Sequence, residues 1–191
     1  MTNRCALLWD EKIVFSRLIE ECGLSCEHVT PHLLAAPFYR GRYATLIIPA
    51  GFANPAYSQL LPALRASSGR IRRYVESGGK LVVFGPGIDR PDAYDWLPFD
   101  VTYRHLHQRG GLECVSSHLC ASLFAGYDPA SIESDGYFSS HAGEVIAKMG
   151  EGAVLIRSGV GEGEVVATTI HEYPSRAFLG EFCRGSVETF L

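Results

Sequence analysis

Residues 44–51 read Ala-Thr-Leu-Ile-Ile-Pro-Ala-Gly, and residues 80–87 read Lys-Leu-Val-Val-Phe-Gly-Pro-Gly. Between these two runs, residues 69–79 carry apolar side chains at helical spacing and end in a pair of glycines. Short, almost wholly apolar runs are typical of strands buried on both faces, and a glycine favours the end of a helix. This stretch therefore predicts a strand–helix–strand unit of a parallel sheet.

The same alternation of apolar runs and amphipathic segments continues along the chain. It predicts an α/β fold: a doubly wound, mostly parallel sheet of flavodoxin-like type, with antiparallel strands near the C-terminus. The expected parallel strands are 4–9, 25–30, 44–49 and 80–84, and the expected antiparallel strands are 144–148, 153–157 and 164–170. The expected main helices are 12–22, 68–77 and about 175–189.

One region differs from this pattern. Residues 89–137 contain several prolines and glycines, with strand-like pieces only at 100–105 and 112–115. We expect a loop-rich insertion here, over one end of the sheet, and long loops often carry function. No repeat or linker interrupts the sequence, so residues 1–191 are expected to form a single domain.

Composition excludes several classes of protein. The chain has 191 residues, 47% of them hydrophobic, which is enough for one full core, and its formal net charge is −4. An acidic balance argues against a dedicated nucleic-acid binder. No apolar run approaches the roughly 18 residues that span a bilayer, and the N-terminus does not resemble a signal peptide. We therefore expect a cytoplasmic protein, with no membrane partner and its six cysteines reduced.

A basic cluster lies on the helix expected at 68–77 and just before it. It consists of Arg65, Arg70, Arg72 and Arg73, and the apolar residues of the same segment are spaced to face inward. Such charge is more often a solvated helix face than a phosphate-binding patch. The sequence favours the solvated face.

The strand–helix–strand unit resembles the central part of the class I glutamine amidotransferase-like superfamily. The resemblance extends to residues 135–138 and 143–147, and to the run Gly-Glu-Gly-Glu-Val-Val-Ala-Thr-Thr-Ile-His-Glu at 161–172. In that superfamily a nucleophilic Cys follows the second strand, and a later strand delivers a catalytic His with a nearby Glu. His171 matches this His, whereas Glu172 follows one residue earlier than the family's acid does. The resemblance covers residues 4–88 and 135–190.

The nucleophile of the family is missing. Gly85 stands where the Cys is expected, and no Cys, Ser or Thr occurs between Leu81 and Val101. Acyl transfer needs an activated nucleophile and a donor for the oxyanion, which usually comes from the backbone N–H of the next residue. That residue is Pro86, which has no N–H. We therefore expect no glutaminase activity, and assign no catalytic residue and no cofactor.

A ligand site can persist without the nucleophile, because open parallel sheets bind ligands at the carboxyl ends of their strands. The residues expected to bind a small molecule there are Gly51, Phe52, Gly85, Pro86, Gly87, His171 and Glu172. His171 should then lie on the order of 10 Å from the 85–87 turn, by the reach of its side chain. Asp10 and Glu11 are expected in the first turn of the first helix, where the helix dipole favours acids.

Two functions follow from this site. The first is a non-catalytic amidotransferase-like domain that serves as a small-molecule-binding, regulatory or subunit-interaction module. The resemblance permits this role, because domains without the nucleophile occur in the superfamily as accessory or oligomerisation units, including within some glycoside hydrolases. The implied partners are a small ligand, a second copy or another protein. The second function is a hydrolase or lyase of altered chemistry that uses His171 and cleft carboxylates.

A third alternative is a metal-binding protein built on residues 105–120. This region contains His105, His107, Cys114, His118 and Cys120. Two His residues separated by one residue project to the same face of a strand, and zinc accepts four such ligands. The spacing matches no familiar zinc module, so we assign no metal ligand and keep metal binding only as an alternative.

Overall fold

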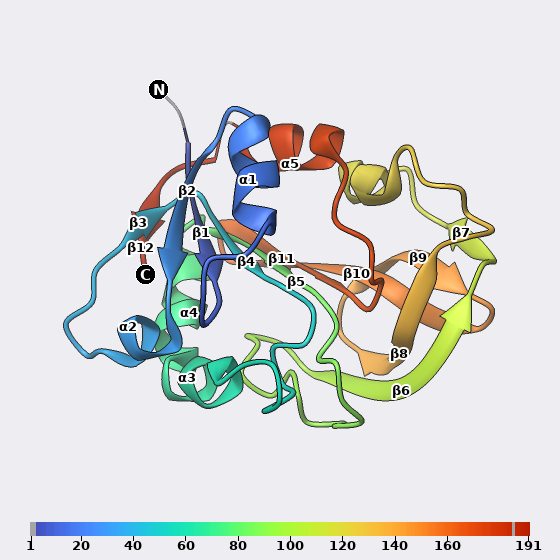
Figure 1. Ribbon diagram of the computed structural model, residues 1–191, viewed down its shortest axis with the longest axis horizontal. Coiled ribbons are helices and arrows are strands. Elements are labelled where there is room, and N and C mark those ends of the chain that lie inside the picture. The colour runs from blue at the N-terminus through green and yellow to red at the C-terminus, as the bar shows by residue number, and fades with distance from the viewer. Residues whose placement is uncertain (1–2, 185) are drawn as a thin grey trace.

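The computed structural model describes residues 3–184 and 186–191. Ten strands form one mixed sheet in the order β2-β1-β4-β5-β11-β10-β8-β6, with β9 beside β10 and β7 beside β9 (Figure 1). The pairs from β2 to β11 are parallel, and all pairs beyond β11 are antiparallel. The fold is therefore α/β with a mostly parallel central sheet and an antiparallel extension, consistent with the predicted flavodoxin-like type.

The strands of the parallel part are close to their predicted positions. They are β1 Arg4–Leu8, β2 Ser25–Val29, β4 Thr45–Ile48, β5 Lys80–Val83 and β11 Gly163–Thr168. The antiparallel extension consists of β6 Val101–Arg109, β7 Leu112–Cys114, β8 Glu133–His141, β9 Glu144–Met149 and β10 Gly152–Val160. A separate ribbon pairs β3 Arg42–Tyr43 with β12 Thr189–Phe190.

Helices pack on both faces of the parallel strands (Figure 1). They are α1 Phe15–Glu21, α2 Pro31–Ala35, α3 Leu60–Ala66, α4 Ser68–Glu76, α5 Arg176–Cys183 and a 3₁₀ helix η1 Leu119–Phe124. Successive strand residues point to opposite faces, so Leu7 packs with α1 and α5 whereas Leu8 packs with α2, α3 and α4. Two buried cores result, one on each face. No helix of the described residues is long and apolar enough to cross a membrane.

The predicted closing helix is too long. Helix α5 begins at Arg176, with Ser175 Oγ accepting a hydrogen bond from the N–H of Phe178, and ends at Cys183. Its buried residues are all in this span, whereas Val187 and Phe190 are largely exposed. The described part of the chain beyond Cys183 therefore has no apolar face to bury as a helix, and β12 pairs with β3 instead.

The predicted first helix also begins too early. Helix α1 starts at Phe15, so neither Asp10 nor Glu11 belongs to its first turn. Asp10 instead accepts hydrogen bonds from Ser58 Oγ at 2.5 Å and from the N–H of Gln59 at 3.0 Å, just before α3. Asp10 therefore accepts hydrogen bonds at the start of α3 and not of α1, because an N–H at a helix start can be satisfied by any nearby carboxylate.

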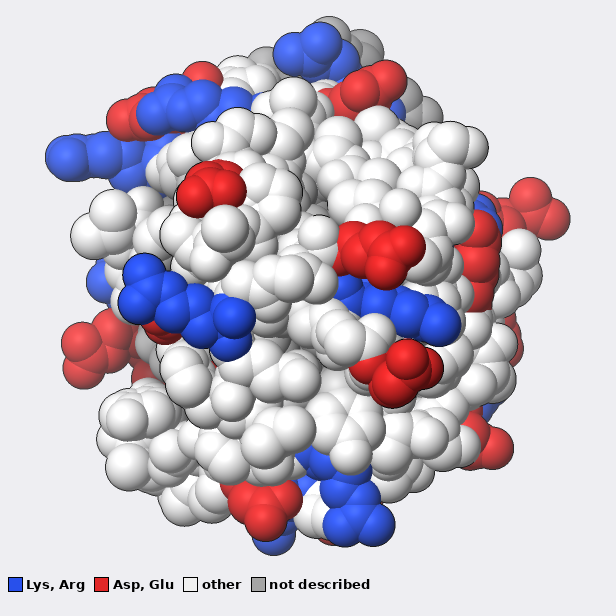
Figure 2. Space-filling model, turned by 90° about the vertical axis from the view of Figure 1, so that its right-hand side faces the viewer, with Lys and Arg blue, Asp and Glu red and all other residues white. Residues whose placement is uncertain are grey.

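Residues 89–137, expected as a loop-rich insertion, supply β6, β7 and the first part of β8. Most side chains of β6 are exposed, so the strand lacks the apolar alternation by which strands are recognised. On the face that includes this end of the molecule, acidic and basic side chains are interspersed among large neutral areas (Figure 2). Two ion pairs lie in the extension, Arg109 with Glu133 and Arg157 with Glu144.

Two turns at the carboxyl ends of β4 and β5 are joined by hydrogen bonds. The N–H of Gly51 donates to the carbonyl of Gly85 at 2.8 Å, the N–H of Ala53 to that of Pro86 at 3.1 Å, and Asn54 Nδ2 to that of Gly87 at 2.9 Å. The backbones approach so closely that a Cβ on Gly87 would lie 2.7 Å from Gly51 Cα. We call this contact the turn clamp.

The close contact in the turn clamp predicts how substitution of two glycines changes the free energy of unfolding. Gly87 has φ +71°, and Gly111 has φ +76° with open space around it. Gly111→Ala should cost about 1 kcal/mol of unfolding free energy, because only the backbone conformation is strained. Gly87→Ala adds a clash with backbone and should cost about 3 kcal/mol or more, near 10 °C in Tm by the usual scaling. Thermal unfolding of both variants checks this, and equal losses would contradict it.

Candidate functional site

A pocket of about 230 Å³ lies at the carboxyl ends of β4 and β5, next to the turn clamp. Residues from both clamp turns and from the antiparallel extension surround it. They are Ala50, Gly51, Tyr57, Gly87, His105, Asp135 and His171. None of these residues carries a thiol or an aliphatic hydroxyl. The pocket thus combines close backbone with two histidines, a carboxylate and a phenol.

Backbone pairing brings Asp135 and His171 together. The N–H of His171 donates to the carbonyl of Glu133 at 3.0 Å, and the N–H of Asp135 donates to the carbonyl of Thr169 at 3.1 Å. The start of β8 therefore pairs with the segment that follows β11. Across this pairing, His171 Nε2 lies 2.5 Å from Asp135 Oδ2. The carboxylate is mostly buried, with 16% of its side chain exposed, whereas 51% of the His171 side chain is exposed.

The carboxylate sets the charge of the histidine. The hydrogen bond that His171 donates to the Asp135 carboxylate raises the pKa of His171 above its ordinary value, although partial burial acts in the opposite direction. When His171 is protonated, Nε2–H donates to Asp135 and Nδ1–H remains free to donate to a bound group. A histidine oriented in this way can hold an oxygen acceptor or transfer a proton.

A second hydrogen-bonded group orients His105. Tyr103 Oη donates to the carbonyl of Asp135 at 2.8 Å and lies 3.0 Å from His105 Nδ1. Since the hydroxyl has only one proton, Nδ1 of His105 must be the donor in the second contact. Burial raises the pKa of Tyr103, which keeps its hydroxyl neutral. When His105 is neutral, its Nε2 is therefore left as an acceptor.

Gly85 lies directly beside the Asp135–His171 pair. A Cβ on Gly85 would be 3.7 Å from the backbone of Thr169 and 3.9 Å from Asp135 Oδ2. The same carboxylate oxygen is 2.5 Å from His171 Nε2. The structure thus brings the 85–87 turn and His171 together, within the distance that the sequence suggested.

The other predicted site residues are placed differently. Gly51, Gly87 and His171 line the pocket, whereas Gly85 and Pro86 are buried within the turn clamp and do not line it. Phe52 is fully buried and packs against Tyr94 and Trp96. Glu172 turns away, with Oε1 accepting from the N–H of Glu133 at 3.0 Å. Phe52 and Glu172 support the surrounding backbone.

The residues of the expected metal alternative do not converge. Cys120 is buried in the core, and Cys114 is exposed on β7. His118 Nδ1 accepts a hydrogen bond from the N–H of Cys120 at the start of η1, and His105 lines the pocket. Among residues 3–184 and 186–191, no three His, Cys, Asp or Glu side chains are grouped to hold a metal ion. The spacing in sequence did not translate into proximity.

Asp135, Tyr57 and the pocket role of His105 were not found from the sequence. Asp135 is 36 positions from His171, so no local spacing links the two. The available signal was an Asp-Gly pair where the strand pattern returns, which is unusual because both residues disfavour strands. Here a Cβ on Gly136 would lie 2.1 Å from the carbonyl of Arg104, so the glycine permits close packing of β6 on β8.

A wider cleft adjoins the pocket. It has a volume of about 420 Å³ and shares Ala50 and Tyr57 with it. Its other walls are Trp9, Asp10, Glu11, Ile13 and Ala56. Tyr57, 66% exposed, therefore stands between a region with two histidines and a region with two acids. The arrangement can accommodate a ligand longer than the pocket itself.

Neither a protein-family model nor a curated protein sequence matches this chain. Solved structures do match over nearly its whole length. A protein from Thermoplasma acidophilum, described as a proposed subunit of GMP synthase, has a TM-score of 0.63 at 13% identity, covering 96% of this chain and 94% of that one. The cytoplasmic protein STM3548 of Salmonella typhimurium has a TM-score of 0.55 at 14% identity, covering 98% and 100%.

A larger enzyme contains the same fold as one part. The β-galactosidase of the haloarchaeon Halorubrum lacusprofundi matches 96% of this chain with a TM-score of 0.58 at 13% identity, but the chain spans only 30% of that enzyme. Likeness at such identities concerns the fold alone. The match to the proposed GMP synthase component therefore supports the α/β fold with its mostly parallel central sheet.

Proposed function

We propose that this chain is a non-catalytic, doubly wound amidotransferase-like domain that binds a small polar molecule beside the turn clamp. The observation that carries the proposal is a pocket that retains an oriented Asp135–His171 pair but has no nucleophile next to it. The ligand expected there offers an oxygen acceptor to His171 Nδ1 and a donor to His105 Nε2. An amide or a hydroxyl compound meets both requirements, and a carboxylate compound does so when it also carries an amino or hydroxyl donor.

Two features argue against acyl transfer. Gly85, the residue beside Asp135, has no side chain, so no thiolate or alkoxide can attack a substrate. The backbone that would stabilise an oxyanion is also unsuitable. Pro86 has no N–H, and the N–H groups of Gly51 and Ala53 already donate to Gly85 and Pro86 within the turn clamp. The geometry supports binding over amide hydrolysis.

The neighbours share their fold with this chain. The same architecture occurs in a proposed component of GMP synthase and as one part of a β-galactosidase. In the β-galactosidase the matched part covers 30% of the enzyme. From the sequence resemblance, we propose for the present chain the role of a regulatory or subunit-interaction module that responds to the bound molecule.

The Asp135–His171 pair favours a second function. A carboxylate that orients a half-exposed histidine and raises its pKa is also the arrangement of a general acid or base. The chain would then be a hydrolase or lyase of altered chemistry. Incubation of each binding compound with the protein, followed by NMR detection of products, separates the two. Conversion that is lost in His171→Gln would favour the enzyme.

The raised pKa of His171 predicts how the stability of the protein depends on pH. Because folding raises the pKa of His171, the pair should stabilise the folded state most below the ordinary pKa of about 6.5, and lose this contribution as pH rises through the raised value. Asp135→Asn removes the negative charge that raises the pKa of His171. Urea unfolding of both proteins should therefore differ most near pH 5.5 to 6 and least near pH 9. A difference that grows with pH would contradict the pairing.

The second prediction concerns the missing nucleophile. The space around Gly85 accepts a Cβ at ordinary contact distance, so Gly85→Cys should fold. It should nevertheless release ammonia from glutamine only at the buffer background, because Pro86 still supplies no oxyanion donor. A coupled ammonia assay measures this. Release above background by wild type or variant, abolished when His171→Ala is added, would overturn the proposal.

The third prediction uses two histidines of one strand. His105 lines the pocket, whereas His107, two residues further along β6, is exposed and does not. In a thermal-shift screen of amino acids, organic acids and sugars, at least one compound should raise Tm. His105→Gln and His171→Gln should each weaken its binding by about tenfold, the effect of one lost hydrogen bond. His107→Gln should bind normally. Equal effects at all three positions, or no binding compound, would refute the site.

A further inference from the structure

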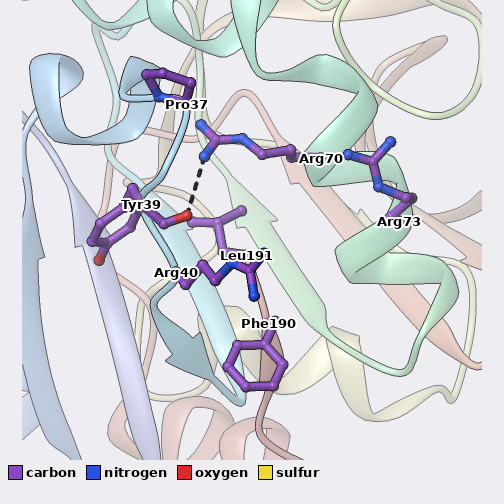
Figure 3. Close-up of a pocket in the computed structure, with 7 residues that line it drawn as sticks. All are labelled: Pro37, Tyr39, Arg40, Arg70, Arg73, Phe190 and Leu191. Atoms are coloured by element: carbon purple, nitrogen blue, oxygen red, sulfur yellow. Dashed lines mark hydrogen bonds between the residues drawn. The ribbon is translucent and has the colours of Figure 1, made fainter.

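A basic pocket of about 350 Å³ lies between α4, the segment before β3 and the β12 strand (Figure 3). It is lined by Pro37, Tyr39, Arg40, Arg70, Arg73, Phe190 and Leu191. β3 leads into the amino end of β4, whereas the first pocket is at the carboxyl ends of β4 and β5. The two pockets share no residue, so they are separate sites.

One of the three arginines is fixed in the wall. Arg70 donates to the backbone carbonyls of Leu34, Ala36 and Tyr39 and to Ser67 Oγ; Figure 3 shows the bond to Tyr39, 3.3 Å long. All these acceptors are neutral. The guanidinium therefore holds the segment before β3 against α4 while its positive charge remains uncompensated.

The other two arginines are exposed. Neither Arg40 nor Arg73 forms an ion pair with an Asp or Glu of residues 3–184 and 186–191. None of the residues that line the pocket has an acidic side chain. Their neighbours in sequence behave differently. Arg72 lies 4.0 Å from Glu76, and Arg65 binds Asp92 and Asp95. The basic cluster thus divides into paired residues and residues that face a cavity.

We propose that this pocket binds a phosphorylated small molecule, with Arg40 and Arg73 on the phosphate and the charge of Arg70 behind them. Guanidinium groups match phosphate oxygens in a fork geometry and stay charged at every physiological pH. The pocket volume is in the range of small-molecule sites. Phe190, 60% exposed at the pocket wall, offers apolar surface to the organic part of the ligand. The proposal thus takes up, for Arg70 and Arg73, the phosphate-binding alternative to the solvated helix face that the sequence favoured.

Isothermal titration at fixed ionic strength tests the proposal, with AMP, adenosine and inorganic phosphate as probes. AMP should bind more tightly than either of the others, because only AMP supplies both parts. Arg40→Gln and Arg73→Gln should each weaken AMP binding by about tenfold, as expected for one charged hydrogen bond. Arg72→Gln is the matched control on the same helix and should bind as wild type.

Four results would overturn the assignment. Absence of AMP binding would remove the site, and an equal loss in Arg72→Gln would reduce it to general surface charge. Equal affinity for AMP and inorganic phosphate would remove the role of Phe190. His171→Gln should leave AMP binding unchanged, since His171 lies in the other pocket. A loss in that variant would place AMP beside the turn clamp instead.

Discussion

Three hydrogen bonds between the 51–54 turn and the carbonyls of Gly85, Pro86 and Gly87 hold the carboxyl edge of the sheet in one arrangement. They require close backbone contact at Gly87, where a Cβ would lie 2.7 Å from Gly51 Cα, so glycine is needed at this position. The same hydrogen bonds limit the chemistry that is available at this edge of the sheet. They occupy N–H groups that would otherwise be free to bind an anion, and they leave side chains from other segments to define the chemistry. The turn clamp thus shapes the pocket and limits its reactivity.

The chemistry comes from the antiparallel extension. Asp135 and His105 lie on β8 and β6, whereas His171 follows β11, so the histidine–carboxylate pair exists only where the two parts of the sheet meet. Ser134 Oγ and Thr169 Oγ1, 2.9 Å apart and both buried, join these segments beneath the pair. Such a buried polar link orients neighbouring strands because its groups would be unsatisfied in any other arrangement.

Sequence reasoning succeeded where burial dominates. The strands at 44–49 and 80–84 are apolar on both faces, and their positions were predicted to within one residue. Gly51, Gly87 and His171 were found because they end buried strands. Asp135 was missed because a long-range partner leaves no local spacing, and β6 was predicted only over 100–105 because its exposed residues show no apolar alternation. The end of α5 was missed because Phe190 suggested that the apolar helical spacing continues beyond Cys183, whereas its side chain is largely exposed.

Strand β6 ends the order of the sheet and is bonded to β8 on one side. A free strand edge can recruit a strand from another molecule and so begin aggregation. Here Arg104, His105, His107 and Arg109 follow one another along it, and its register against β8 shifts twice. The polar and charged side chains along this edge, and its irregular path, oppose edge-to-edge association. The polar side chains that limited the strand prediction to residues 100–105 also disfavour pairing of this edge with another strand.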